Sequence, residues 1–515
     1  MEKRDRLLIL ALCVLAAAMR LYRLGHQSLW VDEILTLAVS DPKPGLNIWD
    51  YLQYNIHGPA HAFIVYLVHL WSTSEFWLRL PSAAAGVITV LALYRWVSFW
   101  IGRTVALVAC TLLTINPMHL YYSQEVRNYS FVLMFGVLAS YFFHRLLQRE
   151  TKPRIFLFCL TTALAALSNF IAAFLFATHT LLYFIHRRIS RSSVKRWLVV
   201  CVIILILIAP WIYRIYAIID VSKLVTPVMP GELSTTERLR GTTTVDLVGV
   251  PYAFYVFSVG FSLGPSLREL HGPVTLAGVI KAHLVPIALT GLAFGAVLLY
   301  GLLTLVRRRR IWLALVLYSV IPILCTLLLC WQNAKAFNPR YLIVGLPAYI
   351  CIISCGLVSI RRRIVKIVLY VTIVFLSVVS IGNYYFNGAY ARENVRDAVR
   401  HLEKNAAPDE CVFAPTVREV VEHYVRTPLN VLAVLAPEGT PRRMVEERLE
   451  RRLAGCDSLW YIRARSWVDD PDGYILRYLD RTFTVGEVRE FDGCSLIHYT
   501  GRREEPGVTG PAAPH

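Results

Sequence analysis

Charged residues are scarce in this chain. Asp, Glu, Lys and Arg make up only 17% of the 515 residues, whereas 56% are hydrophobic and the mean hydropathy is +0.50. A chain of this composition has too few polar side chains to cover one soluble globule, so that class is excluded. The apolar residues instead gather in stretches long enough to cross a bilayer. The sequence therefore predicts an all-α polytopic membrane protein.

Eleven such stretches alternate with short polar or charged turns, and each boundary is placed to within about 4 residues. They lie near residues 7–19, 80–101, 104–122, 129–147, 155–168, 170–186, 197–219, 284–306, 311–330, 341–360 and 364–386. We expect each of them to be a transmembrane helix.

Several motifs are also missing. The chain has no Walker lysine loop and no dinucleotide-binding glycine cluster, so no nucleotide is expected as a cofactor. No Cys-x-x-Cys pair occurs, which argues against a zinc ribbon or a thioredoxin site. Eight of the eleven Cys lie in apolar stretches. At most one disulfide can form among the remaining three, Cys411, Cys456 and Cys494.

The net charge of +18 is confined to alternate loops. The segments that are cytoplasmic if the amino terminus is inside hold 21 Lys and Arg against three acids, Glu2, Asp5 and Glu150. This asymmetry follows the positive-inside rule. It predicts a multi-pass membrane protein with a cytoplasmic amino terminus. Because the charge is explained by topology, no nucleic-acid partner is expected.

The remaining polar sequence suggests two outer loops and an outer domain. We predict a transmembrane domain over residues 1–386, with a first outer loop at about 25–78 and a larger one at about 220–283. The apolar run 62–71 is too short to span, so it is expected to be a juxtamembrane helix. Residues 387–501, with short β-prone runs at 431–435 and 459–462, are predicted to be a small extracytoplasmic α/β domain. Residues 502–515 are predicted to be disordered.

The interiors of the predicted spans contain almost no ionisable groups. Arg95 is the exception, and this scarcity argues against an ion-coupled transporter with midplane carboxylates. Arg20 and Arg23, at the end of the first span, are expected to extend toward the interface. Polar residues within the spans are expected to form interhelical hydrogen bonds, and they include Asn116, His144, Asn169 and His179.

Ionisable and aromatic residues instead gather at the predicted outer helix ends. Five groups occur there: Asp32 with Glu33; His57 with His61; Glu75 with Arg79; Glu125 with Arg127 and Tyr129; and Lys335 with Arg340 and Tyr341. Arg and Lys in such a place can bind a phosphate-bearing lipid headgroup. Each basic residue taken alone could equally be an anchor to membrane lipids.

Five segments in this order resemble the bacterial protein-mannosyltransferase-like glycosyltransferases. They are Leu-Trp-Val-Asp-Glu at 29–33, His-Gly-Pro at 57–59, Leu-Arg-Leu-Pro-Ser from 78, Tyr-Tyr-Ser-Gln-Glu-Val-Arg-Asn-Tyr at 121–129 and Pro-Arg-Tyr-Leu at 339–342. The resemblance covers about residues 5–390. It implies the GT-C fold, which the lipid A aminoarabinose transferases share.

The resemblance implies transfer of a sugar from a polyprenyl-phosphate donor to a glycan, lipid or protein acceptor on the outer side of the membrane. Asp32 would be the catalytic base, Glu33 its neighbour and Glu125 the second acidic motif. The departing phosphate would be stabilised by basic residues. The substrate-binding candidates are His57, Arg79, Arg127, Tyr129, Lys335, Arg340 and Tyr341.

A divalent metal ion is a further possibility from the family pattern, with Asp32, Glu125 and His57 as its ligands. The sequence departs from the commoner His-Pro-Pro pattern because Gly58 holds the middle position. Two other functions remain open on the sequence. A lipid or polysaccharide exporter would bind headgroups at the same charges without making bonds, and an envelope assembly scaffold would tolerate the loss of Asp32.

Overall fold

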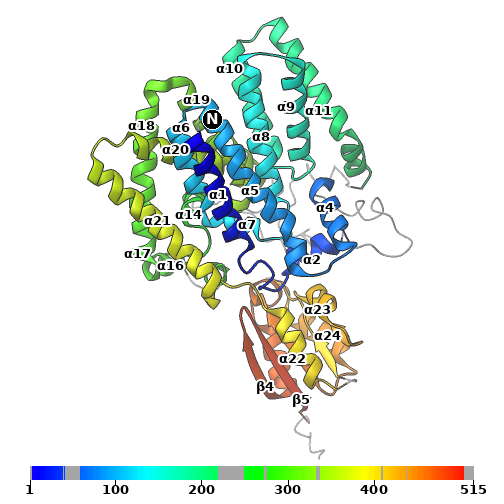
Figure 1. Ribbon diagram of the computed structural model, residues 1–515. Helices are drawn as coiled ribbons and strands as arrows, with labels where there is room; N and C mark the ends of the chain where they lie inside the picture. The colour runs from blue at the N-terminus through cyan, green and yellow to red at the C-terminus, as the bar shows by residue number, and fades with distance from the viewer. Residues whose placement is uncertain are drawn as a thin grey trace, which may run out of the picture. The chain divides into compact units, whose positions relative to one another are not determined.

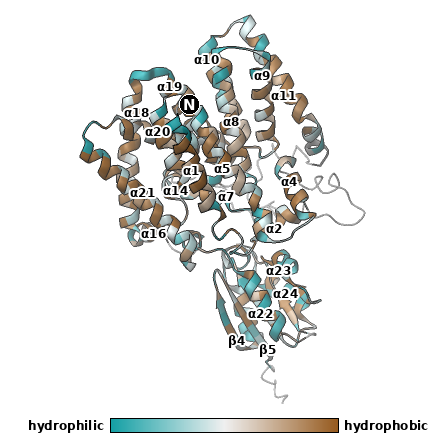
Figure 2. Ribbon diagram, in the orientation of Figure 1, coloured by the Kyte–Doolittle hydropathy of each residue, from teal (hydrophilic) through white to brown (hydrophobic). Residues whose placement is uncertain are grey.

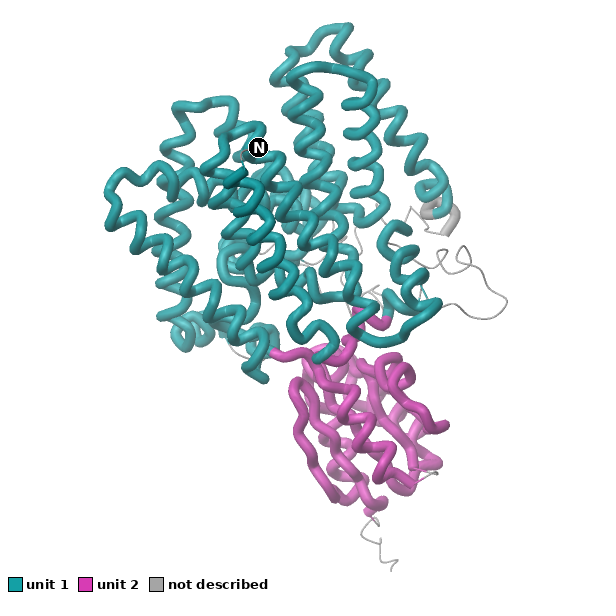
Figure 3. Tube along the Cα trace, viewed as in Figure 1, with its two compact units in different colours: residues 1–26, 35–232, 240–390 teal, residues 27–34, 233–239, 391–515 magenta. Residues whose placement is uncertain are grey.

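The computed structural model describes residues 3–38, 40, 58–218, 249–271, 275–331, 337–407, 410–437 and 439–503. The chain divides into two compact units (Figure 3). The membrane unit comprises residues 1–26, 35–232 and 240–390. The small unit comprises residues 27–34, 233–239 and 391–515. The predicted loop 220–283 lies partly outside the described residues, and the predicted tail 502–515 lies almost wholly outside them.

All eleven predicted spans are helical in the membrane unit (Figure 1). The helices are α1 (Lys3–Leu21), α5 (Glu75–Trp100), α6 (Arg103–Thr114), α7 (Pro117–Ser123), α8 (Tyr129–Gln148), α9 (Lys152–Ala166), α10 (Ala172–Arg187), α11 (Arg191–Ile218), α17 (Leu284–Thr290), α18 (Ala296–Leu305), α19 (Arg309–Trp331), α20 (Leu346–Ser359) and α21 (Arg363–Phe386). Shorter helices are α4 (Pro59–His69), α14 (Gly249–Val259), α15 (Leu267–His271) and α16 (Leu276–Ala282). A π-turn (Gly291–Gly295) joins α17 to α18, and 3₁₀ turns occur at Val306–Arg308 and Pro339–Gly345.

Helix length gives a smaller number of spans than the pattern of apolar stretches does. Within the described ranges, six helices are long and apolar enough to cross a membrane, or seven if α6 and α7 form one span. One of the six is the run Leu284–Trp331, which contains two of the predicted stretches. Helices α9 and α10 have 15 and 16 residues, fewer than the roughly 20 of a typical span. The chain is a multi-pass membrane protein, and eleven spans stay a prediction.

The predicted span 104–122 is broken. Helices α6 and α7 are bent by 59° at a short break between them. Pro117 begins α7, and a proline lacks the amide that would continue the preceding helix. The side chain of Asn116 caps the new helix by accepting a hydrogen bond from the His119 amide at 2.9 Å. The break aims the carboxyl end of α7 at the turn that carries Glu125.

The core of the membrane unit is formed by α5, α6, α8 and α20, and the helices at its edge expose apolar side chains. Hydrophobic residues predominate along the helices of this unit (Figure 2). Helices α18 and α20 approach closely at two glycines. A Cβ atom at Gly301 would lie 2.3 Å from the Ile352 carbonyl oxygen, and one at Gly356 would lie 2.4 Å from that of Val297. Such small residues allow transmembrane helices to pack backbone against backbone.

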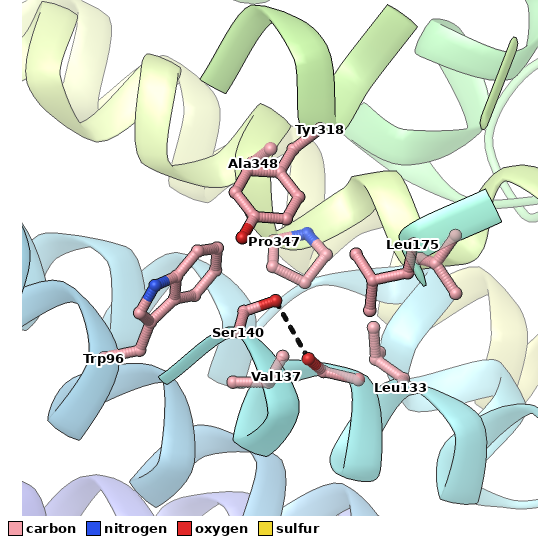
Figure 4. Close-up of a pocket in the computed structure, with 10 residues that line it drawn as sticks. Trp96, Leu133, Val137, Ser140, Leu175, Tyr318, Pro347 and Ala348 are labelled. Carbon is pink, nitrogen blue, oxygen red and sulfur yellow. Dashed lines mark hydrogen bonds between the residues drawn. The ribbon is translucent and has the colours of Figure 1, made fainter. Parts of the chain in front are cut away.

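The four polar residues within the spans form interhelical hydrogen bonds, as predicted. Asn116 donates to the Phe257 carbonyl at 2.7 Å, and Asn169 donates to the Asn128 side chain at 3.0 Å. His179 bonds Ser140 at 3.2 Å, and the indole of Trp96 donates to His144 at 3.2 Å. Nearby, a cavity of about 10 Å³ is lined by Trp96, Ser140 and Tyr318 (Figure 4), which is room for about one water molecule.

The small unit contains a five-stranded sheet in the order β2-β1-β3-β5-β4. The strands are β1 (Cys411–Phe413), β2 (Asn430–Leu432), β3 (Leu459–Ala464), β4 (Phe483–Phe491) and β5 (Cys494–Arg502). The first three pair in parallel, and the last two pair antiparallel. The helices are α22 (Val395–Asn405), α23 (Arg418–Tyr424), α24 (Arg442–Leu453), α25 (Ser466–Asp469) and α26 (Tyr474–Thr482). The predicted α/β class is confirmed. The run 459–462 lies within β3, whereas only the first two residues of the run 431–435 lie in a strand, β2.

A disulfide closes the small unit. Of the three cysteines outside the apolar stretches, Cys411 and Cys456 are bonded, with their Cα atoms 5.9 Å apart. Cys494 is buried and takes no part in this disulfide. The bond ties the first strand of the sheet to the segment that follows α24, and so closes a loop that contains β2.

Candidate active site

The turn between α7 and α8 carries Glu125. Residues 124–128 are all buried, and Glu125 is 0% exposed. Side-chain amides of the turn bond to neighbouring elements. The Gln124 side chain donates to the carbonyls of Arg20 at 2.8 Å and Tyr22 at 2.9 Å. Asn128 donates to the Ser168 carbonyl at 2.9 Å. A carboxylate in such a place is costly without polar neighbours, so the site of Glu125 is built by side chains from several helices.

Three of the predicted site residues meet around Tyr122. The hydroxyl of Tyr122 interacts electrostatically with Glu125, Tyr129 and Arg340. The guanidinium of Arg127 lies 5.9 Å from the ring centre of Tyr129. Only Arg340 is far from the others in sequence, and the fold of the membrane unit adds its cation to an acid, a second cation and two phenols from the segment 122–129.

Arg340 and Tyr341 lie in the 3₁₀ turn Pro339–Gly345. Asn338 starts this turn, because its side-chain oxygen accepts the Arg340 amide at 3.1 Å. The Arg340 guanidinium lies 5.4 Å from the ring centre of Tyr341, and that ring contacts Phe170 with centroids 6.0 Å apart. Lys335, the third member of this predicted group, lies outside the described residues.

An apolar cavity of about 280 Å³ adjoins the same aromatic pair. Its lining includes Gly58, Phe170, Phe176 and Trp211, and most of the remaining lining is Ala, Leu and Ile from α9, α10 and α11. Phe170 therefore links the cavity to Tyr341 and, through it, to Arg340. An apolar space that is connected to a cation through two aromatic rings suits an amphiphile that has an anionic head.

Gly58 has a packing reason that explains the departure from His-Pro-Pro. A Cβ atom at this position would lie 1.9 Å from the Leu167 carbonyl oxygen. The same oxygen accepts the amide of Ala60 at 2.9 Å, so the start of α4 is fixed against the end of α9. His57 itself lies outside the described residues. His61 is 2% exposed, and its ring contacts Phe131.

Arg79 sits in the first turns of α5 and is 1% exposed. Its Nη1 atom donates to the Leu24 carbonyl at 3.0 Å. Glu75, its partner in the sequence group, is the first residue of the same helix. Arg79 thus helps to hold the segment that leads from α1 toward Asp32.

Asp32 and Glu33 form the first turn of α2 (Val31–Ala38) and are grouped with the small unit. Asp32 is half-buried and Glu33 is 0% exposed. The Glu33 Oε2 atom lies 3.4 Å from Arg392 Nη1 and accepts the Trp30 amide at 3.4 Å. The two adjacent carboxylates therefore differ, because Glu33 is engaged in the interior and Asp32 is partly accessible.

The predicted metal ligands are Asp32, Glu125 and His57. Among the residues whose placement is described, no group of three His, Cys, Asp or Glu side chains is arranged to hold a metal ion. His57 is not among them, so the set Asp32, Glu125 and His57 stays a prediction.

Sequence reasoning missed one feature of the membrane unit. Arg20 does not extend to the interface, because it is 0% exposed and donates to the carbonyls of Ala16, Leu113 and Thr114 and to the Nδ1 atom of His119. The break between α6 and α7 presents those carbonyls to it. Arg20 is thereby part of the support beneath the turn 124–128, and its position after an apolar run gave no hint of this.

Comparisons with known proteins identify the fold. The sequence profile of the dolichyl-phosphate-mannose-protein mannosyltransferases matches residues 56–213. The crystal structure of ArnT from Cupriavidus metallidurans in the apo state aligns with a TM-score of 0.56 at 11% identity, covering 95% of this chain and 97% of that chain. No curated protein sequence matches significantly.

The oligosaccharyltransferase of Archaeoglobus fulgidus is a second structural neighbour. Its structure tethered to an acceptor peptide aligns with a TM-score of 0.54 at 11% identity, covering 96% of this chain and 74% of that chain. Its complex with Zn and sulfate aligns at 0.51 and 13% identity, covering 88% and 67%. The chain therefore has the GT-C fold, and residues 56–213 are mannosyltransferase-like, as the resemblance predicted.

Proposed function

We propose that the protein is an integral membrane glycosyltransferase that moves a sugar from a polyprenyl-phosphate donor to an acceptor outside the cytoplasm. The observation that carries the proposal is the meeting of Glu125, Tyr129 and Arg340 around Tyr122, beside an apolar cavity. The GT-C fold and the mannosyltransferase-like segment support the same class of reaction.

The donor is assigned from the chemistry of this region. The cavity lined by Phe170 and Trp211 offers an apolar surface for part of a prenyl chain, and Arg340 offers a planar cation for the phosphate. Arg127 supplies a second positive charge in the turn after α7. Binding of a lipid phosphate explains why cations and an apolar cavity occur together.

In the proposed reaction, Asp32 takes the proton from an acceptor hydroxyl or amine as that group attacks the anomeric carbon. The bond from the anomeric carbon to the donor's phosphate oxygen breaks, and the electron pair leaves with the polyprenyl phosphate. The leaving phosphate gains negative charge, which the guanidinium groups of Arg127 and Arg340 stabilise. A single displacement of this kind inverts the configuration at the anomeric carbon.

The side of the membrane is proposed from the disulfide. A bond between Cys411 and Cys456 forms and persists in an oxidising compartment. The small unit is therefore assigned to the outer face of the bacterial inner membrane, in agreement with the charge asymmetry of the loops. The acceptor would be a glycan, lipid or protein on that face.

Two observations favour a transferase over the alternative functions. The cavity lined by Trp96, Ser140 and Tyr318 has room for about one water molecule, which is too small for the lipid headgroup that an exporter would carry. The half-buried Asp32 stands beside a fully buried Glu33, an arrangement that a passive scaffold does not need.

The test is transfer and release of sugar from a polyprenyl-phosphate donor by the purified protein in detergent. Asp32→Asn keeps the shape of the side chain but removes the proton acceptor. We expect it to lower turnover by roughly 10²-fold or more, with donor binding retained. Turnover equal to that of the wild type would exclude Asp32 as the base.

A further inference from the structure

The segment that carries Asp32 is packed within the small unit. Residues 27–34 are grouped with the carboxy-terminal residues from 391 onward, although more than 350 positions separate them in sequence. Such a grouping needs specific contacts, because the segment itself is only eight residues long. Three kinds of contact are present, and all of them lie within the small unit.

The first kind is hydrogen bonding through the backbone. The Ser28 hydroxyl donates to the Glu393 carbonyl at 2.6 Å, and the Leu29 amide donates to the Tyr424 hydroxyl oxygen at 2.7 Å. Ser28 is 1% exposed and Leu29 is 0% exposed. Buried polar groups of this kind lose free energy if their partners move away, so the two bonds fix the entry to α2.

The second kind is a buried ion pair. Arg392 Nη1 lies 3.4 Å from Glu33 Oε2, and the two side chains are 6% and 0% exposed. Glu33 directly follows Asp32, so this pair acts one residue from the proposed base. Because both charges are buried, separating them costs free energy, which makes the contact hard to break.

The third kind involves Trp30. The guanidinium groups of Arg465 and Arg392 lie 5.3 Å and 6.0 Å from its ring centre. Arg465 is held in turn by Glu393 at 3.2 Å. A cation is attracted to the face of an aromatic ring. Trp30, two positions before Asp32, is therefore also held by the carboxy-terminal residues of the small unit, which we call the carboxy-terminal domain.

We propose that the carboxy-terminal domain is a positioning element for the active site, with Arg392 as its main positioning residue. It would hold the first turn of α2 so that the Asp32 carboxylate meets the acceptor. The inference rests on the proposed function, in which Asp32 is the base. A misplacement of about 1 Å can cost about 10²-fold in rate. A contact with Glu33, the residue next to the base, can therefore control turnover.

The tether is tested first without any activity measurement. Ser28→Cys, made in a Cys494→Ala background, reports on the segment through its rate of labelling by a membrane-impermeant maleimide. Adding Arg392→Gln is expected to speed labelling at least tenfold. The matched control is Arg477→Gln, since Arg477 lies over the ring of Tyr474 in the same unit. Equal labelling with and without Arg392→Gln would overturn the tether.

The positioning role is tested by kinetics. We expect Arg392→Gln to lower kcat at least tenfold while KM for the donor changes less than twofold, because Arg392 acts on the base and not on the donor. Arg392→Lys keeps the charge and should restore part of kcat, which also guards against a variant that fails to fold. Glu33→Gln combined with Arg392→Gln should cost less than the product of the two single effects.

Two outcomes separate this inference from the proposed function. Faster labelling of Ser28→Cys with an unchanged kcat in Arg392→Gln would overturn the positioning role. Full activity of Asp32→Asn would overturn the assignment of the base and the positioning role with it, whereas the tether would still be judged by labelling alone.

Discussion

The two units bury arginine in different ways. In the membrane unit, Arg20 is fully buried, and it donates to backbone carbonyls at the end of α6 and to His119. In the small unit, Arg392 is nearly as buried and faces the Glu33 carboxylate. The difference shows which partners each environment offers to a buried cation. A helix broken inside an apolar bundle supplies neutral acceptors, whereas a polar α/β domain can supply a second charge.

The largest expected change concerns the covalent tie of the small unit. Cys411→Ala with Cys456→Ala removes a bond that spans 45 residues, and the loss of this constraint should lower the free energy of unfolding by about 4 kcal/mol. Denaturant-dependent labelling of the buried Cys494 thiol measures the transition. An unchanged midpoint would show that ion pairs, and not the disulfide, hold this unit together.

Arg20→Met tests how much the buried arginine of the membrane unit contributes to stability. The substitution keeps length but leaves the carbonyls of Leu113 and Thr114 and the imidazole of His119 without this donor. We expect a loss of about 3 kcal/mol in stability, seen as a lower midpoint in thermal unfolding in detergent. Arg95→Met is the control, because Arg95 is exposed near the carboxyl end of α5, and it should leave the midpoint unchanged.

A buried acid in the small unit predicts a pH dependence. Burial raises the pKa of Asp469 from 3.8 to about 7, and the neighbouring Asp470 adds to the rise. Between these two pH values the folded state binds this proton more tightly than the unfolded state does. The contribution of Asp469 to the free energy of unfolding therefore falls as pH rises from about 4 to about 7. Above about pH 7 the loss is complete.

Asp469→Asn removes that titration. The free energy of unfolding of the variant minus that of the wild type should be larger at pH 8 than at pH 4. We expect this increase to be on the order of 2 to 3 kcal/mol. The measurement is the difference in denaturation midpoint at the two pH values. A constant difference between variant and wild type would contradict the assignment of the proton to Asp469.

The smallest expected effect concerns Arg340. Arg340→Ala removes a cation beside Tyr122 and should raise KM for the polyprenyl-phosphate donor about tenfold, or roughly 1.4 kcal/mol. Arg361→Ala is the matched control, because Arg361 is exposed in the turn between α20 and α21. Equal effects of the two substitutions would mean that the donor does not bind at Arg340.

Much of the fold could be predicted from the sequence, because apolar stretches of spanning length and charged turns leave few alternatives in a bilayer. The eleven helical stretches, the helix α4 and the strands β2 and β3 are confirmed on this basis. The break at Pro117 was missed, since the apolar pattern continues across it. Proline and the Asn116 cap end the helix without any change in hydropathy.

For the candidate site, the sequence grouped Glu125 with Arg127 and Tyr129, and it placed Arg340 in a separate group on the same predicted side of the membrane. In the membrane unit, Glu125, Tyr129 and Arg340 all interact electrostatically with Tyr122, and Arg127 lies over the ring of Tyr129. The expected interface position of Arg20 was wrong. An arginine after an apolar run can extend outward or turn inward, and only the carbonyls freed by the broken helix decide between the two.

By itself, the sequence determined that the chain crosses the membrane several times and that an α/β domain follows. These properties depend on hydropathy and periodicity, which are local. Only the tertiary structure decided which cysteines bond, which arginines are buried and that Glu33 faces Arg392. Those outcomes depend on contacts between residues hundreds of positions apart, and the free energy of such contacts is set by burial and partner geometry, which no local pattern encodes.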